Sequence, residues 1–197
     1  MHFVRGGTEA GGGGGGVGER GAGGGEVPGL WAMMFDDDHW YAVKDGDPRA
    51  TALYERHYSC VNLKARRRTG DRRICGPGEK MVLLTAGCDA LFVWRKAKRP
   101  DLAGQEGAYC SIFRNEGDVL SSELILEAEQ LAWRKWPDAR LYTYVDPGKV
   151  GSPNPGYCFK VAGWQKCGET QGGLHILEKR RERGGIGSRS GGEVPGL

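Results

Sequence analysis

Short apolar runs along the middle of the chain predict a β-sheet. Runs typical of strands cover residues 39–43, 81–85, 90–94, 109–113, 141–145 and 174–177. A short glycine-containing link separates the second run from the third, which predicts an antiparallel hairpin. The run at 109–113 is expected to be a third strand of the same sheet.

The clearest helix pattern lies between residues 121 and 136. Ser121 or Ser122 is expected to cap this helix and Pro137 to end it. Its apolar residues recur at three- and four-residue spacing on one face: Leu124, Ile125, Ala128, Leu131, Ala132 and Trp136. This stripe predicts a helix that packs against the sheet.

Two shorter helices complete the pattern. Asp47 as N-cap and Pro48 at the first helical position begin a helix that is expected to continue to about Tyr58. A short helix is predicted over residues 155–162. The order is then strand, helix, three strands, helix, strand, helix, strand, which indicates an α/β or α+β domain with helices on the faces of its sheet.

Glycine content separates the ends of the chain from its middle. Many of the 35 glycines precede Leu30 or follow Gly184, where few apolar residues occur. Residues 1–35 and 181–197 are therefore expected to be disordered tails, and residues 36–180 to form one domain. The heptapeptide GGEVPGL occurs once in each tail, at 24–30 and 191–197; two copies do not make a repeat architecture.

Basic residues gather in three clusters, although the formal net charge is only +3. The clusters lie at residues 56–73, 95–99 and 179–183. Such clusters suit a polyanion and also occur in solvated loops. The residues predicted to contact nucleic acid are those of the exposed loop in the first cluster: Lys64, Arg66, Arg67, Arg68, Arg72 and Arg73.

The six cysteines show neither a CxxC pair nor a zinc-binding spacing. Cys88 and Cys110 lie in apolar runs and are predicted to be buried thiols. No apolar run is long enough to span a bilayer, and the N-terminus lacks a secretion signal. A reducing cytoplasm is the simplest setting, and no membrane partner is expected.

The element order, with the segment from Tyr157 to Gly163 and Trp164, resembles the GNAT superfamily of acyltransferases between about Trp40 and Lys179. The resemblance implies a mixed, mostly antiparallel central sheet flanked by helices, and acyl-CoA as donor. GNAT enzymes bind the pyrophosphate of the acyl carrier in a glycine-containing loop before a helix. Here that loop, residues 114–122, carries Glu116 and Asp118, whose charges oppose a pyrophosphate, so acyl-CoA use is uncertain.

A narrower set of motifs resembles the phage Mom DNA-modification proteins, a divergent GNAT-like branch. These motifs are Arg56-His57-Tyr58-Ser59, the strand that ends at Asp146, and Pro155-Gly156-Tyr157. The resemblance implies transfer of a carbamoylmethyl group to N6 of adenine in phage DNA, inside a bacterial host cell, from a small-molecule donor that it does not identify. It also implies that His57, Tyr58 and Asp146 are catalytic and hold iron, with Tyr157 as a further catalytic residue.

Imidazole, phenolate and carboxylate groups together suit Fe(II). Without a metal, His57 and Asp146 would form an acid–base pair for the amine proton. Each residue also has a structural interpretation: a core histidine, a packing tyrosine, a turn aspartate and, for Tyr157, a helix anchor. Adenine N6 is reachable only when the base is flipped or single-stranded, and aromatic side chains would then stack on it; the rings available are Trp94, Trp133, Trp136, Trp164, Tyr142 and Tyr144.

Three functions therefore stay open. The first is a Mom-related, GNAT-like transferase that modifies adenine in DNA. The second is an acyl-CoA-dependent N-acyltransferase that acts on a small amine or a protein. The third is a non-catalytic nucleic-acid-binding module that uses the basic clusters.

Overall fold

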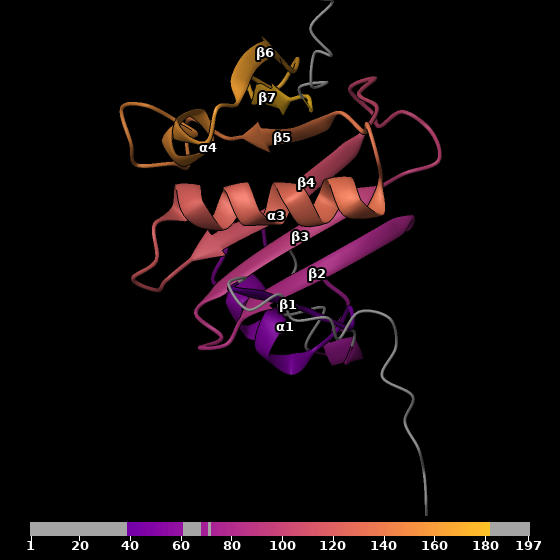
Figure 1. Ribbon diagram of the computed structural model, residues 1–197, viewed down its shortest axis with the longest axis vertical. Coiled ribbons are helices and arrows are strands. Elements are labelled where there is room, and N and C mark those ends of the chain that lie inside the picture. Colours follow the sequence, from indigo (N-terminus) through magenta and orange to yellow (C-terminus); the bar gives the residue numbers. More distant parts are fainter. Residues whose placement is uncertain (1–38, 61–67, 71, 182–197) are drawn as a thin grey trace, which may run out of the picture.

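A computed structural model describes residues 39–60, 68–70 and 72–181, which form one mixed α/β fold (Figure 1). A seven-stranded sheet has the order β1-β2-β3-β4-β5-β7-β6, and every neighbouring pair is antiparallel except β4 and β5. The strands are β1 (Trp40–Val43), β2 (Glu79–Thr85), β3 (Ala90–Lys96), β4 (Ala108–Asn115), β5 (Leu141–Val145), β6 (Gln165–Glu169) and β7 (His175–Lys179). The helices are α1 (Pro48–Glu55), α3 (Ser121–Lys135) and α4 (Tyr157–Val161). The predicted class, a mostly antiparallel sheet flanked by helices, is confirmed for this part of the chain.

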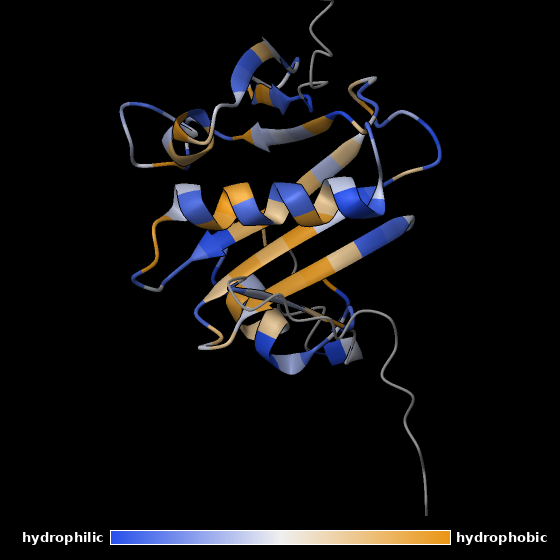
Figure 2. Cartoon of the chain, in the orientation of Figure 1, coloured by the Kyte–Doolittle hydropathy of each residue, from blue (hydrophilic) through white to orange (hydrophobic). Residues whose placement is uncertain are grey.

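Side chains alternate between the two faces of the central strands, so the sheet has two cores. On one face, Leu83 and Phe92 pack with α3 and α4; on the other, Val82 and Val93 pack with α1. Figure 2 shows the apolar residues concentrated on β2 and β3 and as a stripe along α3. The helices therefore cover opposite faces of one apolar sheet, and the sequence pattern of α3 is confirmed.

The start of α3 differs from the prediction. Its N-cap is Leu120, which makes no side-chain cap, and Ser121 is already helical. The Ser121 Oγ instead accepts a hydrogen bond from Asn115 Nδ2 at 3.1 Å. The prediction that Ser121 or Ser122 is the cap is therefore wrong.

Other local predictions are also corrected. Helix α1 ends at Glu55, so His57 and Tyr58 lie in the turn that follows it. Helix α4 begins at Tyr157, because Gly156 in the left-handed conformation is its N-cap. Cys110 is buried as predicted, whereas Cys88 is only half-buried in the β2–β3 turn.

Strand β6 has no counterpart in the sequence prediction. Its residues are exposed except for a half-buried Gly168, so no apolar alternation marks it. It forms as the outer strand of a hairpin with β7 at the edge of the sheet. Such a strand can be identified only from its pairing in the folded structure, and not from its sequence pattern.

Strands β4 and β5 diverge, and their separation opens the sheet (Figure 1). They pair in parallel only from Ala108 to Cys110 and from Leu141 to Thr143, although both strands continue. The ladder between β3 and β4 shifts register here: Val93 pairs with Ile112 and Trp94 with Cys110. Ser111 is the extra residue of this bulge, and bulges bend a strand. The bend leaves a gap between the ends of β4 and β5.

The predicted tails lie outside the described residues, apart from Arg181, and so do Lys64, Arg66 and Arg67 of the basic loop. In the described part of the chain, all helices are too short or too polar to cross a membrane. All six cysteines are free thiols.

Candidate functional site

A cavity of about 140 Å³ fills the gap between the diverging strands. Ser111, Ile112 and Phe113 of β4 form one wall, and Thr143, Tyr144 and Val145 of β5 form the other. Gly156, Cys158 and Phe159 close it from α4, and the turn after α1 adds His57 and Tyr58. His57, Tyr58 and Asp146 were predicted to hold iron, and two of them, His57 and Tyr58, thus line this cavity.

His57 is buried, with only 9% of its surface exposed, and both of its ring nitrogens have hydrogen-bond partners. Ser59 N–H donates to Nδ1 at 3.2 Å, and Ser59 Oγ lies 2.8 Å from the same atom. Since Nδ1 accepts, the neutral ring carries its proton on Nε2, and the backbone of Phe113 accepts a hydrogen bond from the ring. Burial, together with the positive charge of Arg114, lowers the pKa of His57 to about 4. The imidazole is therefore neutral at neutral pH.

Tyr58 stacks on His57 and reaches across to the end of β5. The ring centroids are 4.3 Å apart at an interplanar angle of 31°. The Tyr58 hydroxyl hydrogen-bonds the backbone of Asp146. Burial raises the pKa of this phenol, so it stays protonated at neutral pH. Tyr58 is 40% exposed, so its protonated phenol lies at the mouth of the cavity.

Asp146 follows β5 and is near Tyr58, but it forms no pair with His57. Asp146 Oδ1 accepts a hydrogen bond from Gly148 N–H at 2.9 Å, which organises the turn after the strand. The partners of the His57 ring are Ser59 and Phe113 instead. The predicted His57–Asp146 acid–base pair is therefore not formed in this arrangement.

Tyr157 lies apart from the other predicted residues. It is the first residue of α4, its side chain is 61% exposed, and it does not line the cavity. Its neighbour Cys158 faces the cavity instead. The structure thus brings His57, Tyr58 and Asp146 to one region and leaves the Tyr157 side chain in solvent.

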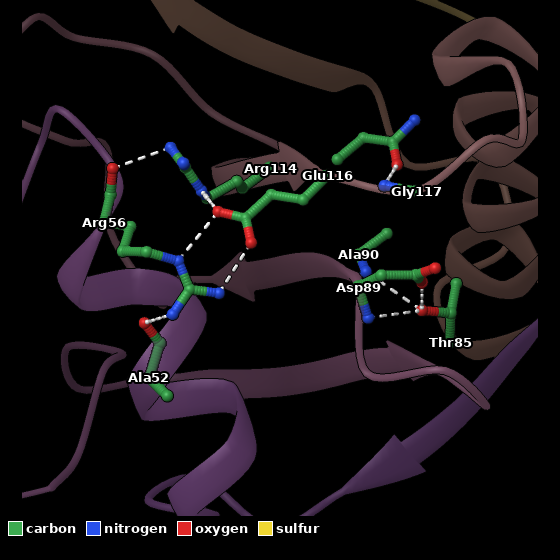
Figure 3. Close-up of polar contacts among 9 residues, drawn as sticks. Ala52, Arg56, Thr85, Asp89, Ala90, Arg114, Glu116 and Gly117 are labelled. Carbon is green, nitrogen blue, oxygen red and sulfur yellow. Dashed lines mark hydrogen bonds and ion pairs between the residues drawn. The ribbon is translucent and has the colours of Figure 1, made fainter.

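Two arginines and one glutamate fasten the His57–Tyr58 turn to the sheet (Figure 3). Arg56 Nη2 and Nε donate to the Glu116 carboxylate at 2.6 and 2.8 Å, and Arg114 Nε donates to the same carboxylate. Arg114 Nη1 also donates to the backbone carbonyl of Arg56 at 2.6 Å. Hydrogen bonds from both arginines lower the pKa of Glu116 to about 2. The cluster fixes the end of α1 against β4, and therefore positions both rings.

Residues 114–122 form the loop that would bind the pyrophosphate of acyl-CoA, and its hydrogen bonds show whether that group can fit. Gly117 N–H donates to Asn115 Oδ1 at 3.0 Å and Glu116 N–H to the Asp89 carbonyl at 2.8 Å, so neither faces a ligand (Figure 3). A Cβ on Gly117 would lie 2.4 Å from Asp89 Oδ2, which places a second carboxylate under the loop. Asp118 adds a third, exposed acid. These residues do not form a cradle for a pyrophosphate.

In this arrangement both ring nitrogens of His57, one of the three residues predicted to hold iron, are engaged by other partners. Nδ1 of His57 accepts from Ser59, and Nε2 carries a proton. Burial raises the pKa of the Tyr58 phenol, which is protonated in this state. Among residues 39–60, 68–70 and 72–181, His, Cys, Asp and Glu side chains form no group of three or more that could hold a metal ion.

The structure adds cavity residues that the sequence did not single out. Cys110 and Cys158 both line the cavity, and burial raises the pKa of each thiol. These thiols are therefore protonated and act as apolar lining rather than as nucleophiles. Arg114 and Glu116 were considered only as part of a phosphate loop; no local pattern reveals that they clamp the end of α1.

The described residues of the predicted basic loop are exposed on the α1 side of the sheet. Arg68, Arg72 and Arg73 are exposed, and the Arg72 carbonyl accepts a hydrogen bond from Thr51 Oγ1 at 3.0 Å. The aromatic rings predicted for base stacking are mostly structural: Trp94, Trp133, Trp136, Trp164 and Tyr142 are all at most 5% exposed. Tyr144 is the one member of that set that lines the cavity.

The geometry thus defines a small cavity between splayed parallel strands, with a protonated phenol at its mouth. Comparison of the chain with protein-family models, with curated proteins and with solved structures finds no match.

Proposed function

We propose that this protein is a GNAT-like, Mom-related transferase that modifies the N6 amine of adenine in DNA. The observation that carries the proposal is the cavity between the diverging ends of β4 and β5, with His57 and Tyr58 stacked at its mouth. The RHYS motif and the position of Asp146 relate the site to the Mom branch.

The chemistry follows from the protonation states of the side chains. The N6 lone pair attacks the electrophilic carbon of the donor; the new N–C bond forms as the bond to the leaving group breaks. Tyr58, kept protonated by burial, gives its proton to the leaving group. The Asp146 carboxylate takes the proton from N6. Asp146 then releases this proton to solvent, and Tyr58 takes one up from solvent, so both groups return to their starting states. His57 stays neutral and holds the Tyr58 ring by stacking.

A DNA substrate also sets demands on access. Adenine N6 lies inside the paired stack of a duplex, so the base must leave the helix to reach Tyr58. Tyr144, half-buried beside the cavity, offers a ring for the displaced base. The exposed arginines Arg68, Arg72 and Arg73 would contact phosphates without reading sequence.

Nucleoside mass spectrometry of DNA from cells that express the protein tests this proposal. We expect a new adenosine species with the wild type and its absence with Asp146→Ala. Traces that are the same for wild type, Asp146→Ala and an empty vector would refute the proposal.

The two other candidate functions make different predictions. An acyl-CoA-dependent N-acyltransferase would use the same cavity, and it predicts that acetyl-CoA binds in a calorimetric titration; the acidic β4–α3 loop leads us to expect no binding. A non-catalytic nucleic-acid-binding module predicts salt-sensitive DNA binding without any modified base. The cavity and its phenol favour a transferase over this module.

A further inference from the structure

Two open cavities of about 620 and 610 Å³ adjoin beyond the end of β7. They share Glu178 and Arg180 as lining residues. The first is also lined by Lys179 and Arg181, and the second by Arg140. A continuous surface rich in basic side chains therefore runs along this end of the sheet, away from the 140 Å³ cavity.

Of the two carboxylates that line these cavities, Glu178 is paired with a cation, and Glu106 is exposed in the second cavity. Glu178 accepts a hydrogen bond from Arg140 Nε, and Lys179 Nζ donates to the fully buried Glu129. Arg180 Nε forms a long ion pair with Glu178 Oε1 at 3.9 Å, while 71% of the Arg180 side chain stays exposed. Arg180 and Arg181 are both exposed, so their guanidinium groups are the charges that this surface presents to a ligand.

The remaining lining is polar and suits phosphate oxygens. Gln130 and Gln165 line the first cavity; Gln105 lines the second, where its amide is held by Arg140 and by the Ala103 carbonyl. Guanidinium and amide N–H groups are the donors that proteins use for DNA phosphates. Small apolar molecules prefer enclosed apolar pockets, which these open cavities are not.

The length of β5 gives the distance between this surface and the candidate site. Arg140 precedes β5 and Asp146 follows it, so six residues of extended chain separate them. At a rise of about 3.3 Å per residue this is roughly 20 Å. Duplex DNA rises about 3.4 Å per base pair, so the same span covers about six base pairs.

We propose that the two cavities form a phosphodiester-binding surface that holds duplex DNA about six base pairs away from the base in the reaction cavity. The choice of DNA as the polyanion rests on the proposed function. Arg180 and Arg181 supply the phosphate contacts, while Arg140 and Lys179 hold the surface in shape through Glu178 and Glu129.

Fluorescence-anisotropy titration of the full chain with a duplex of about 30 base pairs tests this surface at several salt concentrations. The double variant Arg180→Ala/Arg181→Ala should bind about tenfold more weakly at physiological salt, and the slope of log K against log salt should fall by about 2. The matched control is Lys98→Ala/Arg99→Ala, which removes two exposed charges from the β3–β4 connection outside both cavities. The control should retain the wild-type slope.

Equal losses in the two double variants would show a general charge effect and overturn the proposal, and so would wild-type affinity in Arg180→Ala/Arg181→Ala. Circular dichroism of each variant checks that it folds. The nucleoside assay separates this proposal from the proposed function. Loss of binding without any modified adenine in the wild type would support the surface and refute the reaction, whereas modified adenine with unchanged binding would do the reverse.

Discussion

The neutral state of buried His57 makes protein stability depend on pH in a calculable way. An ordinary histidine has a pKa of about 6.5, and burial lowers the pKa of His57 to about 4. Between these values the unfolded chain binds a proton at His57 and the folded chain does not. Because the unfolded state binds more protons there, the free energy of unfolding falls as the pH falls.

The size of the effect follows from the two pKa values. From pH 7 to pH 5, proton uptake by the unfolded chain lowers the free energy of unfolding by about 2 kcal/mol, and by pH 4 the loss is about 3 kcal/mol. His57 is only 9% exposed, so solvent screening does not reduce this value strongly. The effect fades above pH 7, as the histidine of the unfolded chain also becomes neutral.

Urea unfolding of wild type and His57→Gln across this pH range measures the effect. Other titrating groups contribute equally to both proteins, so the difference between their pH profiles isolates His57. The wild type should lose about 2 kcal/mol more than the variant between pH 7 and pH 5. Parallel profiles, or an NMR titration that places the His57 pKa near 6.5, would refute the proposed burial and hydrogen bonding of this ring.

Three further variants test the packing around the site. Gly156→Ala should cost about 1–3 kcal/mol of stability in urea unfolding, because φ is +74° and a Cβ would lie 2.6 Å from Leu177 Cδ1. Glu129→Ala should cost about 3–5 kcal/mol in the same assay, because it leaves the partly buried Lys179 without its carboxylate partner. Glu116→Gln should speed amide hydrogen exchange at residues 56–60, because it weakens the clamp on the turn after α1.

Each of these variants has a matched control in the same chain. Gly151→Ala meets open space, and a loss as large as that of Gly156→Ala would contradict the steric argument. Glu127→Ala removes a half-buried carboxylate from the same helix, so it should cost much less than Glu129→Ala. Asp118→Asn removes an exposed acid from the loop that holds Glu116, and faster exchange at 56–60 in that variant would point to loop charge rather than to the clamp.

Local sequence patterns predicted the strands and helices in which buried residues recur at a regular spacing. Strand β5 spans the predicted 141–145, and the apolar stripe of α3 was found because one face meets the sheet. Sequence patterns did not predict the burial of a residue whose partners lie far away in the sequence. Glu129 looks like a solvent-facing residue of α3, yet it is fully buried because Trp164 and Lys179 donate to it.

The candidate site shows the same division. His57 and Tyr58 were predicted through the resemblance of the RHYS motif to the Mom branch, and both line the cavity. The wall of the cavity was not predictable, since it depends on a bulge at Ser111 that carries no sequence signal. Tyr157 was chosen for its motif, but the first turn of α4 points Cys158 rather than Tyr157 at the cavity.

The central claim is that the Tyr58 phenol at the mouth of the β4–β5 cavity takes part in modifying adenine. The most direct measurement compares Tyr58→Phe with Tyr157→Phe, since each variant removes one phenolic oxygen and only Tyr58 lines the cavity. We predict that nucleoside mass spectrometry of DNA from expressing cells shows the modified adenine with wild type and Tyr157→Phe, and little or none with Tyr58→Phe. Equal amounts of modified base in all three samples would contradict the claim.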